Sequence, residues 1–427
     1  MMYYFIEEFI KQTWDDRRKL MTDRHTLGFS RPAWFEGGLL GRILTMNNLA
    51  NCWPDAVQSL LLKAVLISDK DRARSYWDQF CNSVDIQSID YSTTSITPML
   101  YKRFRDLQGE EIQVAKSVYR HTWSANNLSL HALRKVLLAF DHEGINVTLL
   151  KGAAMISGYY CDPGVRVVGD VDILVPRERA KAAMELLRNL GWKQIYHFED
   201  RKFDYIHGTA FINADQVNID LHWRVLSDIP FDHSYVNFQP QMIAANGFLA
   251  SRLCPEDQLI HTLLHCHKFS PVPLIRWIPD ASILINQSLD FRWDYFFKTV
   301  QALKVEYVVQ SMLLFLNGEK YIDLPESVVQ KLGALSWTKA DQKYFDFMTI
   351  PRGGYFHLYF YIWLLHRRNN PNMGYLNLIF TAPKFVMNSI SIDGYMKLCA
   401  YEITRYAKHI FNRARCAVKW AHISMTK

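Results

Sequence analysis

VTLLKGAAMISGYYCDPGVRVVGDVDILV, residues 147–175, holds the features that decide the fold of this chain. Two short apolar runs enclose a glycine-containing segment. Lys151 and Gly152 follow the first run, and Asp170 and Asp172 open the second. Residues two apart on a β-strand project to the same side, so we expect the two aspartates to lie together. Adjacent carboxylates repel each other unless a cation lies between them, and oxygen ligands of this kind suit Mg²⁺.

A third acid follows on another predicted strand. VNIDLHW, residues 217–223, alternates apolar and polar residues and carries Asp220. Residues 209–212 and the turn Asn213-Ala214-Asp215 precede this strand, and together they predict a β-hairpin. Three carboxylates on neighbouring strands, beside a turn that contains glycine, predict a site for a metal ion and a triphosphate.

The segment around these motifs predicts a small mixed sheet with helices. We expect a strand at 145–150, a short helix at 153–159, a strand at 172–175 and an amphipathic helix at 178–190. On that last helix, Ala182, Leu186 and Leu190 are predicted to lie on one apolar face. A unit of this size without a GxGxxG motif excludes a dinucleotide-binding fold.

The chain on either side has helical periodicity. Apolar residues recur at helical spacing in 56–67 and 110–140, and Thr97-Pro98 predicts a helix start. Helical spacing returns after Pro255, in 256–266 and 274–285. The predicted regions are a helical N-terminal region (1–140), the core (141–250), a helical domain (251–350) and an aromatic and basic C-terminal tail (351–427).

Composition indicates a folded chain, since 49% of the residues are hydrophobic and 14% are aromatic. Seven scattered cysteines without a CxxC pair favour a reducing compartment over a disulfide framework. We expect no secretory signal, and the longest charge-free apolar run, 353–366, is shorter than the roughly 20 residues of a spanning helix. His261 and His265 lack an HExxH motif, so we do not expect zinc there. A cytoplasmic protein is predicted.

The positive charge is concentrated at the C-terminal end. From Thr381 to Lys427, eight lysines and arginines stand against two acids, and this accounts for most of the net charge of +7. Such a tail favours an anionic partner, either nucleic acid or a membrane to which the protein would bind peripherally. A solvated basic helix face is the alternative.

Three motifs taken together, LLKGAA, GVRVVGDVDILV and VNIDLHW, resemble an uncharacterised nucleotidyltransferase family within the superfamily of DNA polymerase β. The resemblance extends from about Pro98 to about Ile285. It implies an α+β fold in which a polymerase-β-like core, a small mixed sheet with flanking helices at about Gly144–Ser227, is embedded in mostly α-helical N- and C-terminal regions.

The resemblance also implies a reaction. The family would be metal-dependent nucleotidyltransferases that move an NMP, with AMP favoured, from an NTP to a hydroxyl-bearing acceptor and release pyrophosphate. Asp170 and Asp172 would ligate two Mg²⁺ or Mn²⁺ ions, and Asp220 would complete the site of the ion that activates the acceptor. Gly152 would let the backbone approach the β- and γ-phosphates, while Lys151 and Arg166 would bind phosphate charge.

Two of these cations have a structural alternative. Lys151 could be a surface lysine at the end of a strand, and Arg166 could form a salt bridge with Asp170 or Asp172.

Two further residues are assigned supporting roles near the site. We expect His222 to project from the face of its strand opposite Asp220, as a core histidine or one behind the metal ligands. Asp280, in the segment RWIPDASILI, would cap a helix facing the cleft or pair with Arg276.

The sequence is compatible with four classes of acceptor: a small metabolite, a sugar, a peptide or a protein. The main rival function is a non-catalytic interaction protein that binds an anionic membrane or nucleic acid through the basic tail. A second rival is a phosphotransferase that uses the same acids to move the γ-phosphoryl group of ATP and releases ADP.

Overall fold

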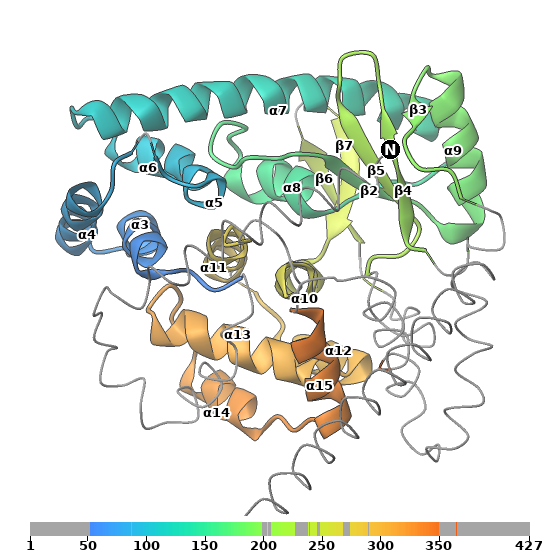
Figure 1. Ribbon diagram of the computed structural model, residues 1–427. Coiled ribbons are helices and arrows are strands. Elements are labelled where there is room, and N and C mark those ends of the chain that lie inside the picture. The colour runs from blue at the N-terminus through green and yellow to red at the C-terminus, as the bar shows by residue number, and fades with distance from the viewer. Residues whose placement is uncertain are drawn as a thin grey trace, which may run out of the picture. The chain divides into compact units, whose positions relative to one another are not determined.

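A computed structural model describes residues 52–86, 88–198, 203, 206–226, 238, 240–245, 248–267, 274–288, 290–349 and 364 (Figure 1). These residues belong to one unit, Leu49–Lys427, and Met1–Asn48 form a separate unit. The predictions for the first 51 residues, for the aromatic run at 353–366 apart from Leu364, and for the basic tail lie outside the described residues. Of the described helices, none combines the length and the apolar character that crossing a bilayer requires.

In the part of the chain that the structure describes, seven strands form a single sheet in the order β3-β4-β5-β2-β1-β7-β6. β2 pairs in parallel with β5, and β1 pairs in parallel with β7, whereas the other pairs are antiparallel. The α+β class with a mixed sheet, which the resemblance implied, is confirmed. The strands are β1 (Thr148–Leu149), β2 (Val171–Leu174), β3 (Lys193–Gln194), β4 (Gly208–Ile212), β5 (Asn218–His222), β6 (Pro240–Ala245) and β7 (Phe248–Leu253).

Helices precede, interrupt and follow the sheet in sequence. Before it come α3 (Ala56–Leu66), α4 (Lys70–Ser83), α5 (Tyr91–Thr94), α6 (Thr97–Phe104) and α7 (Glu110–His142). Between strands lie α8 (Lys151–Met155) with its π-helical continuation Ile156–Tyr160, and the 3₁₀ turn Arg177–Arg179 leading into α9 (Ala180–Asn189). After it come α10 (Pro255–Cys266), α11 (Trp277–Gln287), α12 (Trp293–Leu303), α13 (Glu306–Gly318), α14 (Glu326–Ala334) and α15 (Lys339–Met348).

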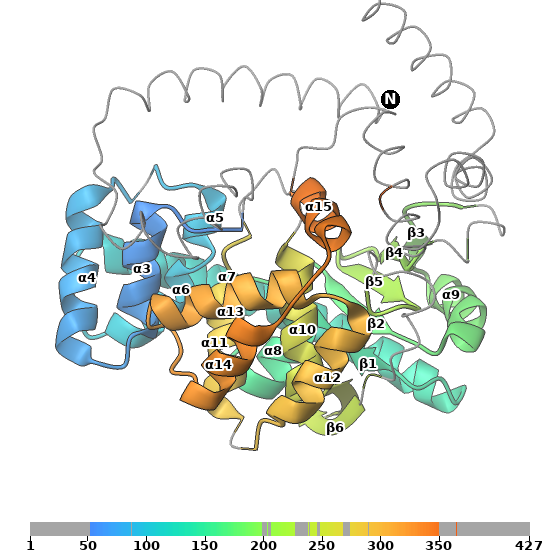
Figure 2. The same cartoon turned by 90° about the horizontal axis from the view of Figure 1, so that it is seen from below.

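Two hydrophobic cores hold these elements together. One core joins the sheet to α9 and to the C-terminal half of α7. The other joins the helices before the sheet to the helices after it, so that α3 contacts α11, and α10 lies against α8 and β7 as well as α12 and α13 (Figures 1 and 2). Regions at the two ends of the described sequence therefore share one core in space.

The long helix α7 belongs to both cores. Its N-terminal residues Ile112 and Ala115 lie in the helical core, and Leu133 and Phe140 lie in the core of the sheet. With 33 residues, the helix is about 50 Å long at 1.5 Å per residue, and Figure 1 shows it crossing from α6 to the sheet. α7 therefore connects the two cores directly.

Of the three residues predicted to share an apolar face on the helix after β2, only Leu186 packs against the core of the sheet, and it is partly buried. In α9 the buried side chains include Ala183 and Leu187, whereas Ala182 is exposed and Leu190 is 43% exposed. Both sets of residues have helical spacing, so periodicity alone could not choose between them. The direction in which the sheet lies from the helix decides which set is buried.

His267, which follows α10, is a histidine of the helical core. Its side chain is buried, and its ring meets the rings of Tyr307 and Phe345 edge-on at centroid distances of 6.4 and 6.1 Å. Burial lowers the pKa of His267 from 6.5 to about 4, because an apolar environment disfavours the charged imidazolium.

This pKa predicts a loss of stability in acid. Between pH 6.5 and pH 4 the unfolded chain binds a proton that the folded chain excludes, so the free energy of unfolding falls as pH falls, by up to about 1.4 kcal/mol per pH unit. Urea unfolding of wild type and His267→Leu across this range measures the effect. The stability difference between them should be constant above pH 6.5 and change below it. Parallel profiles throughout would contradict the assignment.

Candidate functional site

Three aspartates meet at one end of the strand pair β2–β5. Asp172 on β2 lies directly opposite Asp220 on β5 in the parallel register, and Asp170 immediately precedes β2. One carboxylate oxygen from each lies within 4.8 Å of the others. Asp172 is buried, Asp220 is partly buried and Asp170 is exposed, so the cluster opens to solvent on the side of Asp170.

Lys151, the first residue of α8, reaches this cluster. Its Nζ lies 2.5 Å from Asp172 Oδ1, and its side chain is only 19% exposed. The backbone of Lys151 has a φ of 43°, in the left-handed region that is uncommon for residues other than glycine. The ammonium group therefore lies on a buried carboxylate. A surface lysine, the alternative role for Lys151, would instead place this group in solvent.

His222 faces the aspartates, so the prediction that it lies on the opposite side of β5 was wrong. Its Nε2 lies 3.1 Å from Asp172 Oδ1 and 3.2 Å from Asp220 Oδ2. The physical reason is strand alternation, because Leu221 separates Asp220 from His222 and residues two apart share a side. His222 therefore bridges two of the three carboxylates.

These partners change the acidity of the carboxyl groups in different directions. Burial alone would raise the pKa of Asp172, but the charge of Lys151 and the hydrogen bond from His222 hold it well below its usual range. For Asp220, burial is likewise outweighed by the hydrogen bond with His222, which lowers its pKa. Desolvation and the charge of Asp172 raise the pKa of Asp170, for which the described residues supply no hydrogen bond from His222. Asp170 is therefore the group most in need of another cation.

The charged forms of Lys151 and His222 are in turn stabilised by the acids. Burial alone would lower the pKa of Lys151 and of His222, because desolvation disfavours their charged forms. Asp172 outweighs this effect at Lys151, and hydrogen bonds with Asp172 and Asp220 do so at His222, so both pKa values are raised.

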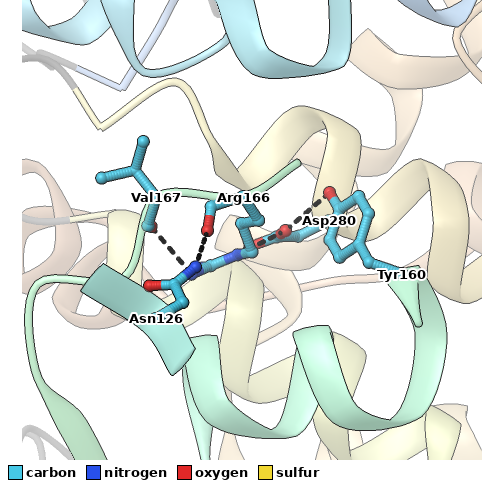
Figure 3. A network of polar contacts seen from close by, with 5 residues as sticks. All are labelled: Asn126, Tyr160, Arg166, Val167 and Asp280. Carbon is cyan, nitrogen blue, oxygen red and sulfur yellow. Dashed lines mark hydrogen bonds and ion pairs between the residues drawn. The ribbon is translucent and has the colours of Figure 1, made fainter. Parts of the chain in front are cut away.

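Arg166 does not pair with Asp170 or Asp172. Its Nε and Nη2 donate to both carboxylate oxygens of Asp280 on α11, at 2.9 Å to Oδ1 and 2.7 Å to Oδ2 (Figure 3). Asp280 therefore pairs with Arg166, and not with Arg276 as one alternative had it. Both side chains are buried, so this is an ion pair inside the protein.

Two further side chains complete the network around this ion pair. Tyr160, at the end of the π-helical turn, donates its hydroxyl to Asp280 Oδ1 at 2.9 Å, and Asn126 of α7 donates to the backbone carbonyl of Arg166 at 2.8 Å (Figure 3). The loop that leads into Asp170 is therefore attached to both α7 and α11. No sequence motif marked Asn126 or Tyr160, because their partners are distant in sequence.

Gly152 lies where a side chain would collide with this loop. A Cβ atom at Gly152 would come within 2.7 Å of Arg166 Nη1 and within 3.0 Å of both Cγ atoms of Val168. A larger residue would force the side chains of Arg166 and Val168 to shift. Close packing therefore favours glycine here, whether or not a phosphate also approaches its backbone.

The sequence of this site and its surroundings matches a known protein family. Residues 91–317 match the family described as uncharacterised nucleotidyltransferase, which is more than half of the chain. The chain belongs to this family of nucleotidyltransferases. The matched segment contains Lys151, the three aspartates and Asp280. A search of curated proteins finds no match.

Several solved structures are similar to part of this nucleotidyltransferase. The antibiotic-resistance factor ANT(2'')-Ia is 13% identical, with a TM-score of 0.32 over 44% of this chain and 98% of its own. The lincosamide antibiotic adenylyltransferase LnuA is 14% identical, with a TM-score of 0.27 over 36% and 94%. An antigenic nucleotidyltransferase-like protein from Paracoccidioides brasiliensis is 16% identical, with a TM-score of 0.30 over 48% and 93%. Likenesses this low carry no argument about the chemistry of this chain.

The buried Arg166–Asp280 pair yields a prediction about stability. Removing one partner leaves an uncompensated buried charge, so Arg166→Met and Asp280→Leu should each lower the free energy of unfolding by about 3–5 kcal/mol. The double variant should lose less than the sum of the two, because it leaves no buried charge. Urea unfolding measures all three.

The exposed pair of Arg74 and Asp78 on α4 serves as the control, since ion pairs in solvent contribute little. Asp78→Asn should be close to wild type in stability. If the variants at Arg166 and Asp280 were equally close to wild type, the network would not hold the loop.

Proposed function

We propose that this nucleotidyltransferase moves a nucleoside monophosphate, AMP, from a nucleoside triphosphate to a hydroxyl group of an acceptor and releases pyrophosphate. The observation that carries the proposal is the convergence of Asp170, Asp172 and Asp220 on two paired strands, with Lys151 beside them. The geometry is compatible with each of the acceptor classes named from the sequence.

The donor set fits a divalent cation. Three carboxylates offer hard oxygen ligands, and their oxygens lie within 4.8 Å of one another, close enough to share an ion. We propose Mg²⁺ or Mn²⁺, in two sites, with Asp170, Asp172 and Asp220 as ligands. When bound, such ions stabilise the charge that develops on the phosphates and favour ionisation of the acceptor hydroxyl.

The protein groups around the ions would divide the remaining work. Lys151, whose Nζ lies on Asp172 Oδ1, is the lysine beside the acids and would bind a phosphate oxygen of the triphosphate. Asp220, which is partly exposed, would accept the proton of the acceptor hydroxyl. Gly152 keeps the turn close to the acids.

Arg166 would act on the phosphates only through space, because its guanidinium is held by Asp280. Asp280 would in turn position the loop that leads into Asp170. The cytoplasmic location and the peripheral binding of an anionic surface stay predictions from the sequence.

A labelling experiment tests the reaction directly. The purified protein is incubated with Mg²⁺ or Mn²⁺, cell extract as acceptor source, and each common NTP labelled at its α-phosphorus. Label should pass to an acceptor from ATP, with release of pyrophosphate, and Asp172→Asn should abolish this transfer. Asp215→Asn is the matched control, since Asp215 is an exposed acid in the turn of the same hairpin.

Three outcomes would count against the proposal in different ways. Release of ADP with labelled nucleotide left in solution would indicate phosphoryl transfer instead. Transfer from another NTP would correct the nucleotide but leave the reaction. The absence of both transfer and metal-dependent NTP binding would overturn the enzyme assignment.

The role of Lys151 can be separated from that of the acids. Lys151→Met removes the ammonium but keeps the length of the side chain, so kcat/KM for the triphosphate should fall by about 10²–10³, as for loss of one charge-stabilising donor. Lys151→Arg keeps the charge and should retain more activity. Steady-state kinetics with varied NTP gives both values, and equal activity in the two variants would show that charge is not what Lys151 supplies.

A further inference from the structure

A second group of metal-binding side chains adjoins the three carboxylates. His207, Asp220 and His222 each offer one donor atom, and these atoms lie within 4.8 Å of one another. Asp220 belongs to both groups. The second group differs in chemistry, because two of its three donors are imidazole nitrogens, which Mg²⁺ binds poorly and transition metals bind well.

The pairing of β4 with β5 brings the two histidines together. Gly208 lies opposite His222 in the register, and a Cβ atom at Gly208 would come within 2.6 Å of the carbonyl oxygen of Leu221 and 3.2 Å of the Cα atom of His222. Only glycine permits such a close approach of the strands. His207 is the residue immediately before Gly208, and its ring centroid lies 5.0 Å from that of His222.

The backbone also holds His207 in place. Its carbonyl oxygen accepts hydrogen bonds from the amides of Trp223, at 2.9 Å, and Arg224, at 3.3 Å, at the end of β5. The residue that carries the first imidazole is therefore attached to the strand that carries the other two donors. This preorganisation is what a metal site requires of its ligands.

His222 is the most constrained of the three residues. Its side chain is 2% exposed, its Nε2 lies against Asp172 and Asp220, and its Nδ1 has no hydrogen-bond partner among the described residues. Nε2 is the nitrogen that lies beside Asp220, so it is the atom through which His222 would share an ion with Asp220. A metal ion there would take the place of the hydrogen bond between the imidazole and the carboxylate.

We propose that His207, Asp220 and His222 form a site for a transition-metal ion of the class of Mn²⁺, Co²⁺ or Zn²⁺, next to the oxygen-only site of Asp170, Asp172 and Asp220. Asp220 would serve as a ligand in both sites. This second site rests on the proposed function in one respect: it shares Asp220 with the oxygen-only site. The inference assigns His207, which no sequence motif marked, as a metal ligand.

Cobalt is the probe for the first test, because Co²⁺ bound by imidazole and carboxylate has visible absorption bands that change with its ligands. Metal-free protein is titrated with Co²⁺ without nucleotide. His207→Gln should lower the affinity of the new site for Co²⁺ at least about tenfold. Mutating residues that only hydrogen-bond to metal ligands already lowers affinity by that factor, and His207 would be a ligand itself. Asp170→Asn, whose acid belongs only to the oxygen site, is the matched control and should leave this binding in place.

Pulsed EPR of bound Mn²⁺ supplies a second readout on the unaltered wild-type chain. Coupling of Mn²⁺ to imidazole nitrogen is expected, and this coupling should be lost or reduced in His207→Gln. Thermal unfolding of the same variant shows whether it is folded. No nitrogen coupling in the wild type, or equal Co²⁺ affinity in wild type and a folded His207→Gln, would overturn the inference.

The failure of this inference can be told apart from failure of the proposed function. Nucleotidyl transfer supported by Mg²⁺, with no nitrogen-ligated ion, would reject the second site and keep the enzyme. A nitrogen-ligated ion without transfer of any nucleotide would keep the second site and reject the proposed reaction.

Discussion

The repulsion between three carboxylates is the constraint on which the rest of the structure depends. Asp170, Asp172 and Asp220 lie at adjoining positions of two parallel strands, and their oxygens share a space less than 4.8 Å across. Like charges this close are destabilising unless donors or cations offset them. Lys151 and His222 do so within the chain, and both are buried against Asp172. That ammonium group is positioned by the end of the short strand β1, the left-handed backbone of Lys151 and the start of α8.

Local spacing predicted much of this arrangement. The two-residue separation of Asp170 and Asp172 placed them together, and the alternation in VNIDLHW placed Asp220 on a strand; the hairpin and most helices also follow from periodicity and turns. The same alternation rule shows why the opposite-face prediction for His222 was wrong, since His222 is two residues beyond Asp220. What alternation could not show is that β5 pairs with β2 and not with another strand. Neighbouring strands were expected because they would bring the three acids together, and the pairing of β2 with β5 is what the structure adds.

Tertiary contacts account for what the sequence did not reveal. Arg166 and Asp280 are 114 residues apart, and nothing in their local patterns indicates that they pair. The same holds for Asn126 and Tyr160, which join them, and for His207, whose place is set by a strand register. The buried face of α9 depends likewise on the position of the sheet. Helices from 52–115 and 259–348 share one core. The regions predicted from the sequence were consecutive segments, so they placed these helices in separate regions.

The Arg166–Asp280 pair has a consequence for how the protein matures during synthesis. The core of the sheet can begin to form once β7 is complete, but the loop before Asp170 lacks its buried counter-ion until α11 has been made. Domains generally fold as units as the chain emerges from the ribosome. A ribosome-bound chain that has just completed the last strand would thus carry all three aspartates and Lys151 without the anchored loop. The geometry of the site is in this way linked to completion of a helix made well after the acids themselves.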